Sequence, residues 1–102
     1  MEKLGRLLAA SALGHEDQAT IQAAAIIAAS SKIIQQDLNL TPDEAQAVSY
    51  RRREVVVKVS HGAVGGQITI HQPRLLVAIN EAAGKLYPNR GPLVDRIIIR
   101  QN

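Results

Sequence analysis

The sequence predicts a small α+β domain in which a three-stranded sheet packs against helices. Apolar residues recur at helical spacing in the first half of the chain, whereas β-branched and polar residues alternate in the second half. The chain has 102 residues, which is the length of one domain with a modest core. We therefore expect one domain over residues 1–102, helical over 1–46 and built of sheet and helix over 47–102.

Two helices are expected in the first half of the chain. The leucines between Glu2 and Leu13 have helical spacing, and Gly14 follows them as a stop signal. A longer Ala-rich helix should run from Ala19 to Leu38, because its isoleucines recur seven residues apart and give it one apolar face. Thr41 and Glu44 then have the spacing of a capping box, but this turn must be short because strand-like residues follow at once.

A β-hairpin is expected after this turn. Val48 and Tyr50 should share one side of its first strand, and the alternating valines should share one side of the second strand, Val55–Ser60. The three arginines before Glu54 would lie at or near the turn. Neither Asn-Gly nor Asp-Gly marks that turn, so its length and type stay open.

The remaining elements are a helix and a strand. The stretch His61–Gln67 contains three glycines, each of which costs a helix about 1 kcal/mol relative to Ala, so we expect a flexible connection there. Ile68–Ile70 fits either a strand or a helix. Pro73 in the first turn should open a helix that ends near Leu86, and Leu93–Arg100 should form the last strand. The expected order is helix, helix, strand, strand, helix, strand.

The net charge of +3 is unevenly distributed along the chain. Residues 1–49 hold three basic and six acidic side chains, whereas residues 50–102 hold nine basic and three acidic ones. This split indicates either that the second half meets a polyanion or only that it has a solvated surface. Because there is no Cys and no long apolar stretch, we expect a cytoplasmic protein without disulfides, thiolate metal sites or a membrane span.

The second half of the chain resembles a known family. Residues 47–84 combine a strand of the form apolar-Val-x-Val, at Val55–Val59, with an x-Pro-x-Leu-Leu helix start, at Gln72–Leu76. A basic alternating strand closes the pattern at Asp95–Arg100. This arrangement resembles the bacterial DciA family, helicase-associated proteins with a KH-like domain. The resemblance implies a KH-like fold, a role in DNA replication, and the replicative helicase and DNA as partners.

No pattern in the sequence predicts catalysis. Cys nucleophiles and the GxSxG, HExxH and P-loop motifs are all lacking, so we expect no enzymatic activity and no cofactor. His15, His61 and His71 are too scattered in the sequence to predict a metal site.

Two features bear on the kind of nucleic-acid contact. Gly62–Gly65 matches GxxG, the loop with which KH domains hold nucleic-acid backbone, although it follows a strand and contains no basic residue. Tyr50 and Tyr87 are the only aromatic residues, so a base-stacking platform is not expected.

Basic residues are the candidates for nucleic-acid binding. Those on the expected strands would converge on one surface if the strands are neighbours, which would suit salt-sensitive phosphate binding. The alternative is a charged sheet edge that only prevents aggregation. The candidate residues are Arg51, Arg52, Arg53, Lys58, Arg74, Arg96 and Arg100.

Three functional hypotheses follow. The first is a non-enzymatic replication adaptor similar to the DciA domain, which touches DNA without sequence preference and meets the helicase through its helices. The second is an RNA- or ribosome-associated KH-like module. The third is a structural protein that forms homo-oligomers through its Ala-rich helix.

Overall fold

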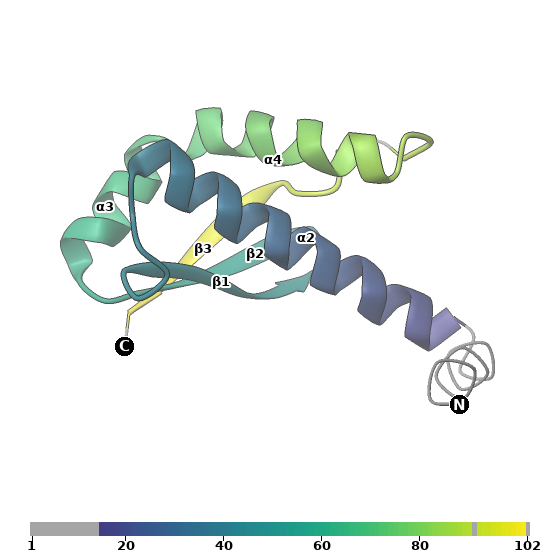
Figure 1. The fold of residues 1–102 in the computed structure, drawn as a ribbon, viewed down its shortest axis with the longest axis horizontal. Helices are drawn as coiled ribbons and strands as arrows, with labels where there is room; N and C mark the ends of the chain where they lie inside the picture. The colour runs from purple at the N-terminus through teal and green to yellow at the C-terminus, as the bar shows by residue number, and fades with distance from the viewer. Residues whose placement is uncertain (1–14, 91, 102) are drawn as a thin grey trace.

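The fold is a three-stranded sheet with helices packed on one of its faces, and the computed structural model describes it over residues 15–90 and 92–101. The expected helix at Glu2–Leu13 lies outside the described residues. The elements are α2 (His15–Leu38), β1 (Ala45–Arg51), β2 (Glu54–Val59), α3 (Gly62–Ile70), α4 (Gln72–Leu86) and β3 (Arg96–Gln101). In Figure 1, α2 crosses in front of the sheet, and α3 lies at the end of the sheet where the C-terminus is found.

The sheet is mixed, with the strand order β1-β2-β3. β1 and β2 form the expected antiparallel hairpin, whereas β3 pairs in parallel with β2. A parallel pair cannot be closed by a tight turn, and here α3 and α4 provide the crossover. The strands expected at Val55–Ser60 and Leu93–Arg100 therefore belong to one sheet, as predicted.

The hydrophobic core lies between the sheet and the helices. Ile26 and Ile34 of α2 and Leu75 and Ile79 of α4 are fully buried against the sheet. The prediction that the alternating valines share one side of β2 is confirmed, and this side faces the core, since Val55, Val57 and Val59 are all buried. We call this covered side of the sheet the inner face.

α2 contacts β1 closely because alanines face it there. Ala45 and Ala47 are buried, and small side chains at both positions let the helix come near the strand. Gln35 of α2 donates a hydrogen bond to the carbonyl of Ala45 (2.8 Å), and the Ser31 hydroxyl accepts one from the amide of Ala47 (2.8 Å). These side chains provide partners for backbone groups of a strand at the edge of the sheet.

The connection from α2 to β1 contains the predicted capping box. The Glu44 amide donates to the Thr41 hydroxyl (3.3 Å), and the Glu44 carboxylate accepts from the Thr41 amide (3.0 Å). The turn ends there, because β1 begins at Ala45. A capping box usually stabilises the start of a helix, but in this protein it stabilises a single turn before the strand.

A β-bulge changes the expected alternation of β1. The register shifts between Ala47 and Ser49 and leaves Val48 without a partner on β2. Tyr50 is then opposite Val55 and packs against the core, whereas Val48 is 42% exposed. The expectation that Val48 and Tyr50 share one side is therefore wrong, because an extra residue in a strand reverses the sides of those that follow.

The expectation of a flexible connection at His61–Gln67 is also wrong. The segment from Gly62 to Ile70 is helix α3, which buries Gly65 against the sheet. A Cβ atom on Gly65 would lie 2.9 Å from Cγ2 of Ile99. The glycine permits a close contact between helix and sheet, and this packing outweighs the low helix propensity of the stretch. The order of the described elements is therefore helix, strand, strand, helix, helix, strand.

Two neighbouring glycines of α3 provide a matched test of this packing. Gly65→Ala should lower the free energy of unfolding by about 1 kcal/mol, because the stiff Ile99 side chain must move and the gain in helix propensity offsets only part of the cost. Gly66→Ala should raise it by up to about 1 kcal/mol, since no atom lies within 4 Å of the added methyl. Urea unfolding of both variants measures the difference, and equal effects would contradict the described packing of α3.

Candidate nucleic-acid interface

The second side of the sheet carries no helix among the described residues, and we call it the outer face. Its side chains are exposed or half-buried, in contrast to the buried valines of the inner face. The strand register arranges nine of them in three rows across β1, β2 and β3. The rows are Arg51, Glu54 and Arg96; then Ser49, Val56 and Ile98; then Gln46, Lys58 and Arg100.

The first and third rows of this face carry the cations, and the central row between them is apolar. Arg51 and Arg96 flank Glu54, which forms an ion pair with Arg96 at 2.9 Å. Val56 and Ile98 lie side by side in the central row and are half-buried. The outer face therefore holds four cationic side chains and one carboxylate.

Lys58 and Arg100 are the most distinctive pair on the outer face. They are direct partners in the parallel register, both are exposed, and neither has an ion-pair partner among residues 15–90 and 92–101. Like charges directly opposite each other on a sheet are destabilising. An anion that lies between them relieves this repulsion, so the pair favours a phosphate or carboxylate ligand.

The arginines Arg51, Arg52 and Arg53 have three different positions. Arg51 ends β1 and lies on the outer face, whereas Arg52 and Arg53 form the turn of the hairpin. Both turn residues have positive φ angles, 53° and 67°, as in the type I′ turns that suit the twist of a hairpin. Arg52 is exposed and has no hydrogen bond or ion pair within the described part of the chain.

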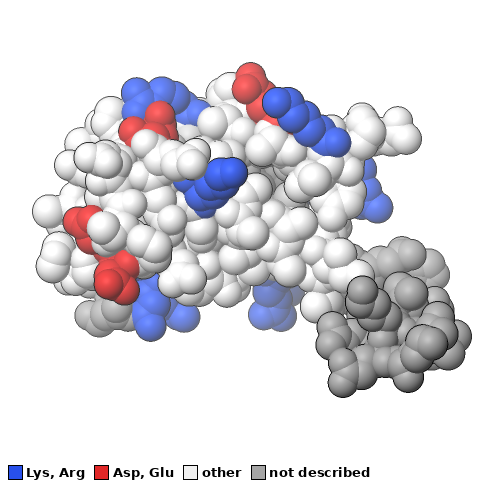
Figure 2. Space-filling view, viewed as in Figure 1, with Lys and Arg blue, Asp and Glu red and all other residues white. Residues whose placement is uncertain are grey.

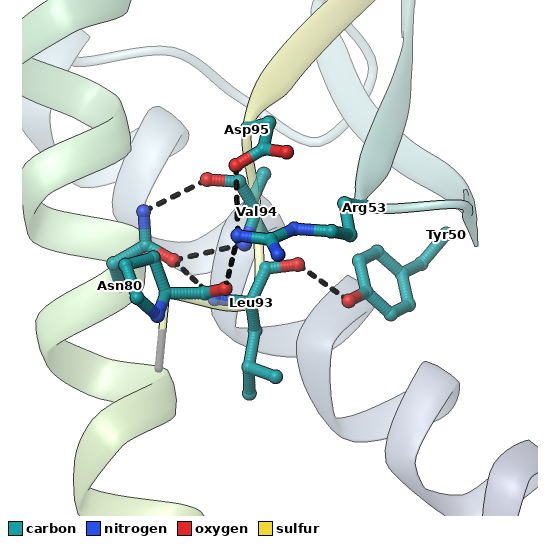
Figure 3. A network of polar contacts seen from close by, with 7 residues as sticks. Tyr50, Arg53, Asn80, Leu93, Val94 and Asp95 are labelled. Carbon is teal, nitrogen blue, oxygen red and sulfur yellow. Dashed lines mark hydrogen bonds and ion pairs between the residues drawn. The ribbon is translucent and has the colours of Figure 1, made fainter. Parts of the chain in front are cut away.

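Arg53 connects the hairpin to the segment that precedes β3 (Figure 3). Its guanidinium donates to the carbonyl of Pro92 (2.6 Å) and to the carboxylate of Asp95 (3.0 Å), with which it forms an ion pair. Its own carbonyl accepts a hydrogen bond from the amide of Asp95 (2.7 Å). Arg53 therefore has a structural role that its place in a basic run does not reveal.

Asn80 and Tyr50 hold the same segment from two other elements (Figure 3). The Asn80 amide oxygen of α4 accepts hydrogen bonds from the amides of Leu93 and Val94, and its nitrogen donates to the carbonyl of Val94, all at 2.9 Å. The Tyr50 hydroxyl donates to the carbonyl of Leu93. Burial raises the pKa of Tyr50 more than the nearby Arg53 lowers it, so this hydroxyl stays protonated as a donor at neutral pH.

These contacts explain why the last strand is shorter than expected. Residues Leu93 to Asp95 direct their backbone groups to Asn80, Tyr50 and Arg53 rather than to β2, and β3 begins only at Arg96. Sequence reasoning did not identify Asn80, because a single polar residue in an amphipathic helix gives no signal of a partner so far along the chain.

Arg74 lies away from the outer face. Its guanidinium forms an ion pair with Asp37 at 2.8 Å and so connects α4 to α2. Figure 2 shows the side of the molecule on which α2 and α4 lie, where basic side chains are scattered and several stand beside acidic ones. The structure therefore brings four predicted cations, Arg51, Lys58, Arg96 and Arg100, onto one face and places Arg53 and Arg74 in ion pairs elsewhere.

The other sequence motifs form no site in the structure. The GxxG residues lie in the first turns of α3, where Gly65 packs on the sheet. Within residues 15–90 and 92–101, no group of three or more His, Cys, Asp and Glu side chains is placed to hold a metal ion. None of the described helices is long and apolar enough to cross a membrane.

No protein-family model matches this chain, and no curated protein matches it. Function is therefore inferred from the arrangement of the side chains.

Two adjacent turn residues test the structural role of Arg53. Arg53→Gln should lower the free energy of unfolding by about 1 kcal/mol, because it removes an exposed ion pair and a charged hydrogen bond to Pro92. Arg52→Gln is the matched control, since Arg52 has a similar backbone conformation, and its effect should stay within about 0.5 kcal/mol. Chemical unfolding measures both, and equal stabilities of the two variants would show that Arg53 is no more than an exposed turn residue.

Proposed function

We propose that the protein is a non-enzymatic adaptor that binds the sugar–phosphate backbone of nucleic acid with the outer face of its sheet. The observation that carries this proposal is the pairing of Lys58 with Arg100, two exposed cations that form no ion pair among the described residues, although Asp43 lines a hollow beside Lys58. Arg51 and Arg96 add two cations to the same face. Phosphate contacts of this kind give sequence-independent, salt-dependent affinity.

The spacing of the rows suits contacts to more than one phosphate. Lys58 follows Glu54 by four positions along β2, so the two cationic rows lie about 13 Å apart. The apolar row of Val56 and Ile98 lies between them and can contact a sugar or a base. A ligand backbone that runs along the strands would therefore meet cations at both ends of the face.

The two tyrosines give no reason to expect sequence readout. Tyr50 packs against the core with its hydroxyl bonded to Leu93, and Tyr87 is half-buried against the same core. Neither ring lies on the outer face to stack on a base, which is how single-strand binding proteins hold their ligands. Affinity on this face would come mainly from charge, so binding should be sequence-tolerant.

The resemblance to the DciA family adds a partner to this proposal. A KH-like domain of that family associates with the replicative helicase, and the strands that carry the resemblance are those that form the outer face here. We therefore take DNA as the nucleic acid and the replicative helicase as the protein partner. On this proposal the helicase contacts the helices, which leaves the outer face free for DNA.

The salt dependence of DNA affinity tests the role of the outer face. Each phosphate contact to a single strand contributes about 0.7 to the slope of log affinity against log salt concentration, so Lys58→Gln with Arg100→Gln should reduce the slope by about 1.4. Arg74→Gln is the matched control and should leave it unchanged, because Arg74 is paired with Asp37 away from this face. Fluorescence anisotropy with a labelled oligothymidylate gives the slopes.

Two results would contradict the proposal. An unchanged slope in the double variant would show that the outer face does not bind DNA, and a preference for the matched oligouridylate would favour an RNA-associated role. Binding of the same proteins to the purified replicative helicase of the host tests the protein partner separately from DNA. The double variant should still bind the helicase, and failure of the unaltered protein to bind it would remove the helicase from the proposal.

A further inference from the structure

A groove runs between α2 and α4 on the side of the helices that faces away from the sheet. Its larger part, about 490 Å³, has a floor of small and apolar residues from both helices. A second hollow of about 330 Å³ continues it and shares Ile33, Gln36 and Ala78 with the first. We call this continuous feature the α2–α4 groove. Its floor is formed by Ala29, Ile33, Ala78 and Ala82.

The width of the groove follows from the alanines. Larger side chains at these positions would fill the space between the helices, as Ile26 and Ile79 do closer to the sheet. Leu86 at the end of α4 also lines the groove and is 53% exposed. A furrow of small residues with an exposed leucine at its end can receive the apolar stripe of another helix, in the way ridges of one helix pack into grooves of others.

The charges along the groove select the occupant. Lys32 of α2 and Lys85 of α4 line its larger part from opposite walls, and neither has an ion-pair partner in the described part of the chain. Asp37 lines the smaller part but is neutralised by Arg74. Glu81 is the single carboxylate of the larger part, so the groove favours a helix with acidic side chains at the end that meets the lysines.

The charge of residues 1–14 does not match that of the groove. Residues 1–14 hold two basic side chains, Lys3 and Arg6, and one acidic side chain, Glu2, so their charge does not complement the lysines.

A second copy of the chain could offer its Ala-rich helix α2, which begins with the acidic residues Glu16 and Asp17. The isoleucines Ile26 and Ile34 of that helix are buried in its own core, so its apolar stripe is not free to enter the groove. A helix of a different protein can present both an acidic end and a free apolar stripe.

We propose that the α2–α4 groove binds an acidic amphipathic helix of a partner protein. This surface lies on the helices, opposite the outer face, and its role does not depend on nucleic-acid binding by the sheet. The two surfaces would allow the protein to hold a protein partner and a nucleic acid at the same time. The groove would then provide the protein-binding half of an adaptor.

Binding of designed peptides tests this inference. The probe is a fluorescein-labelled amphipathic peptide of about four helical turns, with Ala and Leu on one face and glutamates near one end. The unaltered protein should bind it at least about tenfold more tightly than the same peptide with lysines in place of the glutamates. Lys32→Glu with Lys85→Glu should reverse this preference. Ala82→Met should lower the affinity for both peptides, because the larger side chain would fill the floor of the groove.

A charge reversal on the opposite side of the molecule serves as the control. Lys58→Glu with Arg100→Glu should keep peptide affinity while oligothymidylate affinity falls, and circular dichroism confirms that each variant is folded. Equal binding of the two peptides, or a loss of peptide affinity only in the Lys58 and Arg100 variant, would overturn the inference. A dimer in sedimentation velocity that the Lys32 and Lys85 variant abolishes would also overturn it, since the occupant would then be a second copy of the chain.

Discussion

The parallel register of β2 and β3 is the constraint on which the rest of the structure depends. It places Arg96, Ile98 and Arg100 beside Glu54, Val56 and Lys58, and so creates the rows of the outer face. A shift of one residue would turn the arginines of β3 toward the core and expose Ile97 in their place, because side chains alternate along a strand. The same parallel pairing requires a long crossover, and α3 and α4 in that crossover cover the inner face. One pairing thus produces both a packed face and a charged one.

Side chains from three elements fix this register by holding the chain just before and at the start of β3. Asn80 of α4, Tyr50 of β1 and Arg53 of the hairpin turn bind the backbone from Pro92 to Asp95. Gln72 at the start of α4 accepts a hydrogen bond from the amide of Ile97 (3.2 Å). Each such bond contributes about 1 kcal/mol, so together they are a sizeable fraction of the stability of a small domain. Hydrogen bonds therefore connect the hairpin, the crossover helix α4 and the last strand, and Arg53 of the basic turn forms some of these bonds.

The sequence was most informative where local pattern and final environment agree. The alternating valines of β2 and the proline-initiated α4 were predicted because one side of each meets the core over its whole length. α3 was missed because the packing that stabilises it, Gly65 against Ile99, joins residues far apart in the chain. The bulge at Val48 has no local signature, and it reversed the side on which Tyr50 lies. The three consecutive arginines show why the roles of site residues could not be predicted from the sequence. Their sequence environments are alike, yet only Arg53 is held by partners that are distant in the chain.

The central claim is that the two sides of the molecule have different roles and that nucleic acid meets the bare side of the sheet. Amide chemical-shift mapping by NMR, with an unlabelled oligothymidylate added to ¹⁵N-labelled protein, tests it most directly. The account predicts that the largest shift changes occur at Lys58, Arg100 and their neighbours on β1, β2 and β3, while amides along α2 and α4 change little. Changes confined to the helices, or to the Gly62–Gly65 turn at the start of α3, would contradict it.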